Sequence, residues 1–322
     1  MEWLSLEETI KKIPTPIVGL MLALAASGNL VQSYGELYRN IFGIISGIIL
    51  ILYLVKIVKY PKKVKEELKN PVVASVFPTL SMGIMLLSTY IKPFVPSLSF
   101  GIWIIGLVLH VVLIINFTSK YILNFNINQV FTSWFIPYVG IVVASVTAPV
   151  FEMLLLGRIL FWFGLISYFI LLPIVLKRVF KIKNIPEPAQ PTISIFAAPV
   201  ALCLAGYMNS FPEKSMFLVW ILVGISQFSY LMVILQLPRL LKIKFYPSYS
   251  AFTFPLVISA ISIKLTNGFL MNNGSSISIL NYIVKIEEVI GIAIVLYVLI
   301  KYIDFVLKES IVNKPNKKQT YS

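Results

Sequence analysis

Few side chains in this 322-residue sequence are suited to covalent chemistry. It contains one histidine, His110, and one cysteine, Cys203, so a metal site built from several of these ligands is excluded. No nucleophile elbow or phosphate-binding loop is present, and no cofactor is expected. The sequence also leaves no room for a soluble domain. These observations disfavour an enzyme or a receptor.

Prolines, in contrast, recur at regular spacing. They stand near the starts of alternate apolar segments at intervals of 56 to 62 residues, and a small or polar residue follows three or four positions later. The pairs are Pro16 and Gly19, Pro78 and Ser81, Pro137 and Gly140, Pro199 and Cys203, and Pro255 and Ser259. The first turn of a helix tolerates proline, which explains any single one of them. The recurrence favours five bent helices around a central path, which these ten residues and Thr253 would line.

The elements that must position these residues are transmembrane helices. Hydrophobic residues make up 58% of the chain and charged residues 12%, whereas soluble domains carry about 25% charged residues. A span needs about 20 largely apolar residues. Ten continuous apolar runs fit, so a β-barrel is excluded: 14–34, 40–58, 72–91, 100–118, 131–151, 157–176, 192–210, 216–237, 249–268 and 281–303. We predict an all-α protein of five parallel helical hairpins, with five inner proline-kinked helices and five outer helices.

Basic residues predict the orientation. With ten spans, 21 of the 27 lysines and arginines fall on the side of the two termini, which the positive-inside rule places in the cytoplasm. We expect residues 1–13 to form a cytoplasmic amphipathic segment, 14–305 the transmembrane domain of a plasma-membrane protein, and 306–322 a disordered cytoplasmic tail. Lysines that face anionic headgroups explain the net charge of +14 without a nucleic-acid partner.

Three of the charged residues within the predicted spans need an interpretation. Lys264 in the ninth span has two interpretations: it raises the anion concentration at the outer mouth, or its stem carries the charge to the outer interface. Glu287 and Glu288 in the last span are interpreted as structural, with one of them paired to Lys285 or Arg158. The proline-marked helices carry neither the acidic ring of a cation path nor the buried carboxylate of a proton-driven one.

Two short segments resemble a known family. The ninth span contains Ala251-Phe252-Thr253-Phe254-Pro255, and the first contains Pro14-Thr15-Pro16-Ile17-Val18-Gly19-Leu20. Both are similar to segments of the tellurite-resistance/dicarboxylate transporter family, which includes plant guard-cell slow anion channels and the yeast malate permease and sulfite efflux pump. Ten spans, cytoplasmic termini and parallel hairpins agree with this resemblance over residues 10–305.

The resemblance implies more than the residues alone. It implies five inner helices around a narrow pore, a homotrimer, and a phenylalanine that occludes the pore at the position of Phe254. Considered without the resemblance, Phe254 is more simply a residue packed between helices. No role carries over to Lys264, Glu287 or Glu288.

The function that follows is a passive conduit for small inorganic or organic anions across the lipid bilayer, closed by the ring of Phe254. Its lining of small side chains, hydroxyls and backbone dipoles would bind ions weakly enough to release them. The alternative is a proton-coupled carrier of malate, another C4-dicarboxylate or sulfite. Its candidate proton sites are His110, Glu152 and Glu287, although His110 is more simply a polar contact between helices.

Overall fold

The computed structural model describes residues 6–312, and the secondary structure over that range is helical. The α-helices are α1 (Leu6–Lys12), α2 (Ile17–Val31), α3 (Glu36–Lys59), α4 (Pro61–Glu67), α5 (Pro71–Val76), α6 (Thr79–Ile91), α7 (Pro96–Phe117), α8 (Phe135–Val139), α9 (Val142–Thr147), α10 (Leu154–Leu176), α11 (Pro199–Ser210), α12 (Met216–Leu240), α13 (Thr253–Asn272) and α14 (Ser278–Val312). Among the short helical turns, the argument below uses η1 (Gln32–Tyr34), η4 (Thr132–Trp134), η5 (Ala148–Phe151), η7 (Glu187–Ala197) and η8 (Pro247–Phe252).

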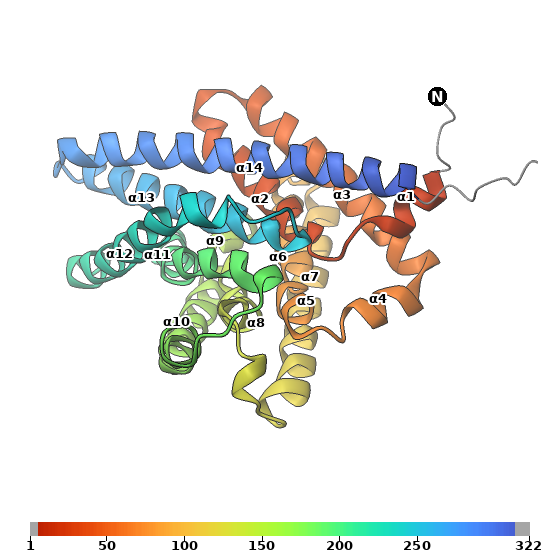
Figure 1. The fold of residues 1–322 in the computed structure, drawn as a ribbon. Helices are drawn as coiled ribbons and strands as arrows, with labels where there is room; N and C mark the ends of the chain where they lie inside the picture. The colour runs from red at the N-terminus through yellow and green to blue at the C-terminus, as the bar shows by residue number, and fades with distance from the viewer. Residues whose placement is uncertain (1–5, 313–322) are drawn as a thin grey trace, which may run out of the picture.

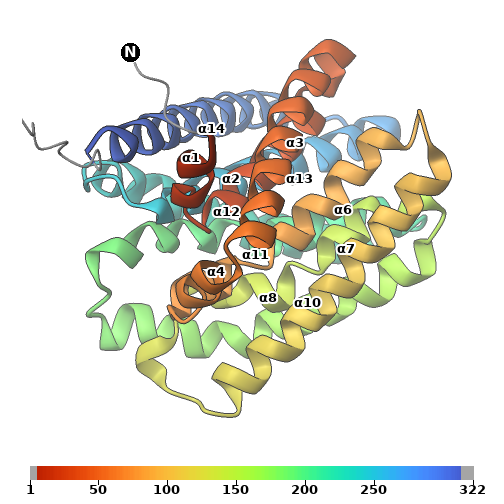
Figure 2. The same cartoon turned by 90° about the vertical axis from the view of Figure 1, so that its right-hand side faces the viewer.

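Five hairpins form a closed ring. Each inner helix packs against the outer helix that follows it, in the pairs α2 and α3, α6 and α7, α9 and α10, α11 and α12, and α13 and α14. The inner helices also contact one another in the cyclic order α2, α6, α9, α11, α13 and back to α2. The ring therefore brings α14 back beside α1 and α2, and α3 and α7 lie at the periphery (Figure 1, Figure 2). The predicted architecture is confirmed.

Burial separates the two layers. We compare the most apolar 18-residue stretch of each span. In every inner span except the bent third one, 67% to 94% of these residues are buried, whereas in the outer spans 22% to 33% are buried. The exposed residues of the outer spans are mostly Ile, Leu, Val and Phe, which suits contact with lipid acyl chains. Nine continuous helices within the described residues are long and apolar enough to cross a membrane, and a bent pair supplies a tenth span.

The inner spans are interrupted, and prolines stand near the interruptions. Pro78 separates α5 from α6, Pro199 follows η7, and Pro255 lies in the first turn of α13 after η8. The third inner span bends by 48° between α8 and α9, just after Pro137. Pro16 differs, because it simply caps the start of α2. Proline has no N–H to donate and so suits the point where one helical piece ends and the next begins.

The helix boundaries differ from the predicted ones mainly in the outer layer. The fourth and sixth spans extend to Ile122 and Ile182 through a widened last turn, several residues beyond the predicted ends. The last helix, α14, continues to Val312, which corrects the expected disorder over residues 306–312. The rest of that tail and residues 1–5 of the amphipathic segment lie outside the described residues.

Hydroxyl groups join neighbouring repeats. The partners are separated by about one repeat length, 58 to 60 residues: Ser75 Oγ and Ser133 Oγ at 2.6 Å, Thr132 Oγ1 and the Thr192 carbonyl at 2.6 Å, and Ser248 Oγ and the Pro188 carbonyl at 2.5 Å. All of these residues precede the main inner helices. The repeats are therefore held together by polar contacts at the end where their inner helices begin.

His110 joins two of the repeats at mid-span. Its ring is fully buried on α7; Nε2 lies 3.0 Å from the Pro137 carbonyl, and Nδ1 lies 2.8 Å from Ser81 Oγ. Because a carbonyl only accepts, Nε2 carries the hydrogen and Nδ1 is an acceptor. Nδ1 faces the Ser81 hydroxyl, whose one hydrogen is shared between Nδ1 and the Pro78 carbonyl at 2.7 Å. Both nitrogens are thus used in holding α6 and α8, and the interpretation of His110 as a polar contact between helices is confirmed.

A buried ion pair fixes the first hairpin to the segment that follows it. Lys56 Nζ, which is fully buried, lies 2.6 Å and 2.8 Å from the two Glu67 carboxylate oxygens and 2.6 Å from the Ile13 carbonyl. The Glu67 carboxylate accepts from the Thr15 N–H at 3.1 Å and also from the Thr15 hydroxyl, which lies 2.9 Å from Tyr53 OH. This network sets the position at which α2 enters the bundle.

Replacing His110 tests its role in packing. His110→Leu leaves the Pro137 carbonyl without its donor, so we expect it to lower the free energy of unfolding by about 1–3 kcal/mol. Asn116→Leu on the exposed face of the same helix is the matched control and should change it little. Thermal unfolding of the two detergent-solubilised variants measures the difference; equal melting temperatures would contradict this role.

The ion pair of Lys56 and Glu67 makes a second prediction. Removing one partner leaves the other charge buried, so Lys56→Met or Glu67→Leu alone should cost about 3 kcal/mol of stability. The double variant should recover much of that loss because it leaves no unpaired charge. Lys69→Met, which breaks the exposed 2.5 Å pair with Glu66, should cost less than about 0.5 kcal/mol. A double variant no better than either single one contradicts the prediction.

Candidate functional site

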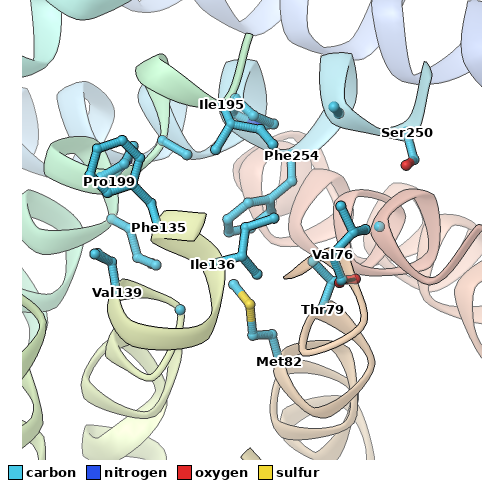
Figure 3. A pocket seen from close by; sticks show the side chains of 16 residues that line it. Val76, Thr79, Met82, Phe135, Ile136, Val139, Ile195, Pro199, Ser250 and Phe254 are labelled. Atoms are coloured by element: carbon cyan, nitrogen blue, oxygen red, sulfur yellow. Dashed lines mark hydrogen bonds between the residues drawn. The ribbon is translucent and has the colours of Figure 1, made fainter. Parts of the chain in front are cut away.

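A small cavity lies on the axis of the inner ring, and we call it the axial cavity. Its volume is about 40 Å³. All five inner segments line it: Gly19; Val76, Thr79 and Met82; Phe135, Ile136, Val139 and Gly140; Ile195, Ala198, Pro199 and Leu202; Ser250, Ala251, Phe254 and Pro255. None of these residues is charged. In Figure 3 the ring of Phe254 points into this group, with Ile136 on one side and Val76 and Thr79 on the other.

One lining residue from each inner segment occupies a repeat-related position. They follow one another at intervals of 56 to 60 residues: Gly19, Thr79, Val139, Ala198 and Phe254. Four of the five are small or medium-sized, and only Phe254 carries a large ring. That side chain is 6% exposed. The four smaller residues leave the space on the axis that the ring of Phe254 occupies.

The helices surrounding this cavity point their N-termini at it. The main inner helices begin at Ile17, Thr79, Val142, Pro199 and Thr253, each at or within three residues of a lining residue. A helix N-terminus carries a partial positive charge, although several first-turn N–H groups here are already paired, such as Gly19 N–H with the Pro16 carbonyl and Val143 N–H with the Gly140 carbonyl, both at 3.0 Å. Five such ends converge on an apolar cavity without a charged side chain, so its electrostatic character comes from the backbone.

Close packing around the cavity leaves little room for a side chain at Gly19 and none at Gly140. A Cβ on Gly19 would lie 3.2 Å from Ser250 Cβ, where the first and last repeats meet. A Cβ on Gly140 would lie 2.3 Å from the Ile136 carbonyl and 2.7 Å from Met82 Sδ. Any larger residue at Gly140 would force the bend between α8 and α9 to change.

The residues predicted from sequence divide into two groups. Gly19, Gly140, Pro199, Phe254 and Pro255 line the axial cavity. The other seven residues do not. Pro16 lines a separate cavity, where the inner segments begin, Ser81 faces His110, and Ser259 faces α12 and α14. The remaining four are packed among the helices: Pro78, Pro137, Cys203 and Thr253. These seven residues do not line the axial cavity, and their place along the rest of the path stays a prediction.

For Ser81 and Cys203 the cause is a one-residue offset, whereas Pro16 and Ser259 have no lining residue next to them. The prediction chose the small or polar residue after each proline, Ser81 or Cys203, whereas the adjacent apolar residues Met82 and Leu202 line the cavity. One residue turns a helix by about 100°, so an offset of one selects a different face. Repeat spacing alone does not identify the correct face, because Ser81, Gly140 and Cys203 recur at similar intervals of 59 and 63 residues.

A larger cavity of about 680 Å³ opens where the inner segments begin, and we call it the inner vestibule. It is lined by Pro14–Pro16, Pro71–Val73, Phe131, Pro186, Pro188, Ala189 and Tyr246–Ser248, together with Lys12, Glu66, Glu67, Asn70 and Phe305. In each segment these residues precede those of the axial cavity. Since the inner helices run parallel, the vestibule and the axial cavity lie in sequence along one direction.

Lys264 lies away from the axial cavity. Its ammonium group donates to the Leu30 carbonyl and to Ser33 Oγ, both at 2.8 Å, and pairs with the carboxylate of Glu288. It lies in a separate cavity of about 540 Å³ between η1, α13 and α14. Its charge is paired with Glu288 and its three hydrogens are used. These contacts do not support a role in attracting anions, which stays a prediction. Glu288 likewise pairs with Lys264 instead of Lys285 or Arg158.

Within residues 6–312, including the axial cavity, no three or more histidine, cysteine or acidic side chains lie close enough together to bind a metal ion. Glu152 is exposed on the turn before α10, and the single cysteine is buried. The polar side chains that reach the axial cavity are Thr79 and Ser250. This arrangement suits passage or weak binding more than bond chemistry.

Comparison with known proteins agrees with this geometry. The family model described as voltage-dependent anion channel matches residues 15–303. The chain is also 26% identical over 243 residues to an uncharacterized transporter of Methanocaldococcus jannaschii, covering 68% of this chain and 71% of the relative. Both indicate a membrane transporter or channel and not an enzyme, and they confirm the resemblance seen in the first and ninth spans. This multi-pass membrane protein belongs to the voltage-dependent anion channel family.

Proposed function

We propose that this protein conducts small anions passively along the axis of the inner ring, with the Phe254 ring as the gate. The observation that carries the proposal is the axial cavity itself, to which all five inner segments contribute and into which Phe254 projects. A cavity of about 40 Å³ holds little more than a water molecule. An ion therefore passes only when the ring moves aside.

The preference for anions follows from the backbone. Five helix N-termini converge on the cavity, and their partial charges favour a negative ion without a basic side chain that would bind it tightly. The acidic side chains at the inner vestibule do not oppose the entry of anions, because each is paired with a lysine. Glu67 is paired with Lys56, and Glu66 lies 2.5 Å from Lys69. An apolar lining makes dehydration the main barrier, so weakly hydrated anions such as nitrate should pass most readily.

The proton-coupled carrier remains the second candidate, with malate, another C4-dicarboxylate or sulfite as its substrate. Two of its proposed proton sites have lost support: His110 uses both ring nitrogens in packing, and Glu152 is exposed away from the axial cavity. Glu287 is buried and contacts an inner helix. It is the one observation that favours this alternative.

The remaining assignments are proposals of the same kind. The excess of basic residues at the vestibule end supports cytoplasmic termini and an inner vestibule that faces the cytoplasm. We place the protein in the plasma membrane, in contact with lipid along the exposed faces of α3, α7, α10, α12 and α14. A homotrimer is proposed from the family resemblance. Cross-linking in native membranes tests the oligomer.

Removing the gate ring is the direct test of the proposal. If the open state of the wild type is populated to between about 0.1% and 10%, Phe254→Ala should raise nitrate and chloride flux by about 10- to 1000-fold. Flux into proteoliposomes, with and without a pH gradient, measures this. Phe252→Ala, a fully buried phenylalanine two residues away that does not line the cavity, is the control. Unchanged anion flux together with pH-driven malate uptake by the wild type would establish the carrier.

The repeat-related positions give a second test. Ala198 immediately precedes α11, one residue before Pro199, and Phe254 likewise stands one residue before Pro255, at the start of α13. Adding Ala198→Phe to the Phe254→Ala variant should place a ring on the axis from another repeat and return the flux towards the wild-type level. Cys203→Phe in the same background puts the ring outside the lining and should not close the path. A double variant as conductive as Phe254→Ala would mean that the axial cavity is not the path.

A further inference from the structure

Glu287 is a buried acidic side chain with no evident counter-charge. It lies within α14 and is 1% exposed, and neither of its carboxylate oxygens has a well-formed hydrogen bond. It forms no ion pair in the part of the chain that the structure describes. Its neighbour Glu288 faces another direction and pairs with Lys264. An ionised carboxylate without a partner is among the most costly groups to bury in a membrane protein.

The groups around Glu287 are polar but uncharged. Ser259 of α13 and Gln227 of α12 are its nearest hydrogen-bonding neighbours, and Tyr230 of α12 also faces it. Ser259 Oγ, Gln227 Nε2 and Tyr230 OH are themselves buried and without hydrogen bonds. The carboxyl group therefore sits in a cluster of neutral groups that can donate to it or accept from it.

Charged groups on the packed elements do not neutralise this site. The helix α2 contains none, and α12 has only Arg239 in its last turn. The lysine of α13, Lys264, forms an ion pair with Glu288. Lys285 of α14 is exposed, whereas Glu287 is buried. Tyr230 is the titratable group facing Glu287 from α12. The neutral form of Glu287 is the one that this packing accommodates.

We propose that Glu287 is a proton-binding site, and that its protonated form holds α13 in the occluded arrangement seen here. A proton from water binds one carboxylate oxygen and gives a neutral acid that can donate to Ser259 or Gln227. The cavity that holds Lys264 lies within one turn of Glu287, because Val284 and Glu288 line it. This cavity is the side from which the proton arrives.

Packing explains how the proton is coupled to the gate. Gly291 lies one turn after Glu287 on α14, and a Cβ there would already be 3.5 Å from the backbone of Leu256 and Val257 on α13. That is ordinary van der Waals spacing, so α13 and α14 are in direct contact beside Glu287. Glu287 is itself 1% exposed, so an ionised carboxylate there has little access to water. Ionisation therefore favours a state in which α12, α13 and α14 separate, and α13 carries Phe254. By linkage, raising the pH moves the equilibrium away from the occluded state.

The link to Phe254 rests on the channel function proposed above, whereas the protonation of Glu287 does not. Two measurements on the full-length protein keep them apart. Infrared spectroscopy in proteoliposomes detects a protonated carboxylic acid directly. Nitrate flux as a function of pH reports the effect on conduction. The test variant is Glu287→Gln, a neutral side chain of nearly the same shape, and Glu213→Gln, on the exposed loop before α12, is the control.

We expect a carboxylic-acid carbonyl band at neutral pH in the wild type and in Glu213→Gln, and its loss in Glu287→Gln. Wild-type nitrate flux should rise from neutral to mildly alkaline pH, and Glu287→Gln should stay at the low-pH level throughout. Phe254→Ala combined with Glu287→Gln should conduct at every pH. If Phe254→Ala alone does not increase flux, the proposed channel function is wrong. The infrared measurement still shows whether Glu287 is protonated.

Three results would overturn the proposal. The first is a carboxylic-acid band that is unchanged in Glu287→Gln, because the proton would then reside elsewhere. The second is a pH dependence of flux that survives in Glu287→Gln. The third is a requirement for sodium ions that Glu287→Gln removes, because the cluster would then hold a metal cation in place of a proton.

Discussion

The hydrocarbon of a membrane offers no hydrogen bonds, and the fold depends on this constraint. Interrupted helices are tolerated at that depth only where protein or water meets the freed backbone groups. The inner spans of this protein are interrupted near Pro78, Pro137, Pro199 and Pro255, and a shell of continuous outer helices surrounds them. The shell shields the breaks from lipid, which allows new helix N-termini to begin within the membrane.

The same breaks give the axial cavity its character. Helices that begin around one point bring partial positive charges there, from α2, α6, α11 and α13 more than from the six-residue α9, with no basic side chain among the lining residues. Fixed dipoles of this kind attract an anion less strongly than a lysine would, and weak attraction is compatible with rapid release. Among the lining residues at repeat-related positions only Phe254 carries a large ring, and this is the observation on which the proposed gate rests.

Polar groups buried in the bundle have distinct roles. The pair of Lys56 with Glu67 and that of Lys264 with Glu288 tie helices together at the two ends, and His110 ties two inner helices at mid-span. Their hydrogen bonds compensate their burial. Glu287 differs, because its neighbours are neutral and it touches the helix that carries the gate. A group whose charge is not compensated by the fold is free to respond to its surroundings.

The sequence by itself determined the membrane class, the ten spans, the five parallel hairpins and the position of Phe254 through a short resemblance. Apolar runs and prolines at intervals near 60 residues suffice for this, since span length and repeat period are properties of the chain alone. Tertiary structure decided which face of each inner helix turns to the axis. A rotation of about 100° separates adjacent residues, which is why Met82 and not Ser81 lines the cavity. It also decided the ion pairs, because the partners of Lys56 and Lys264 depend on how the hairpins pack.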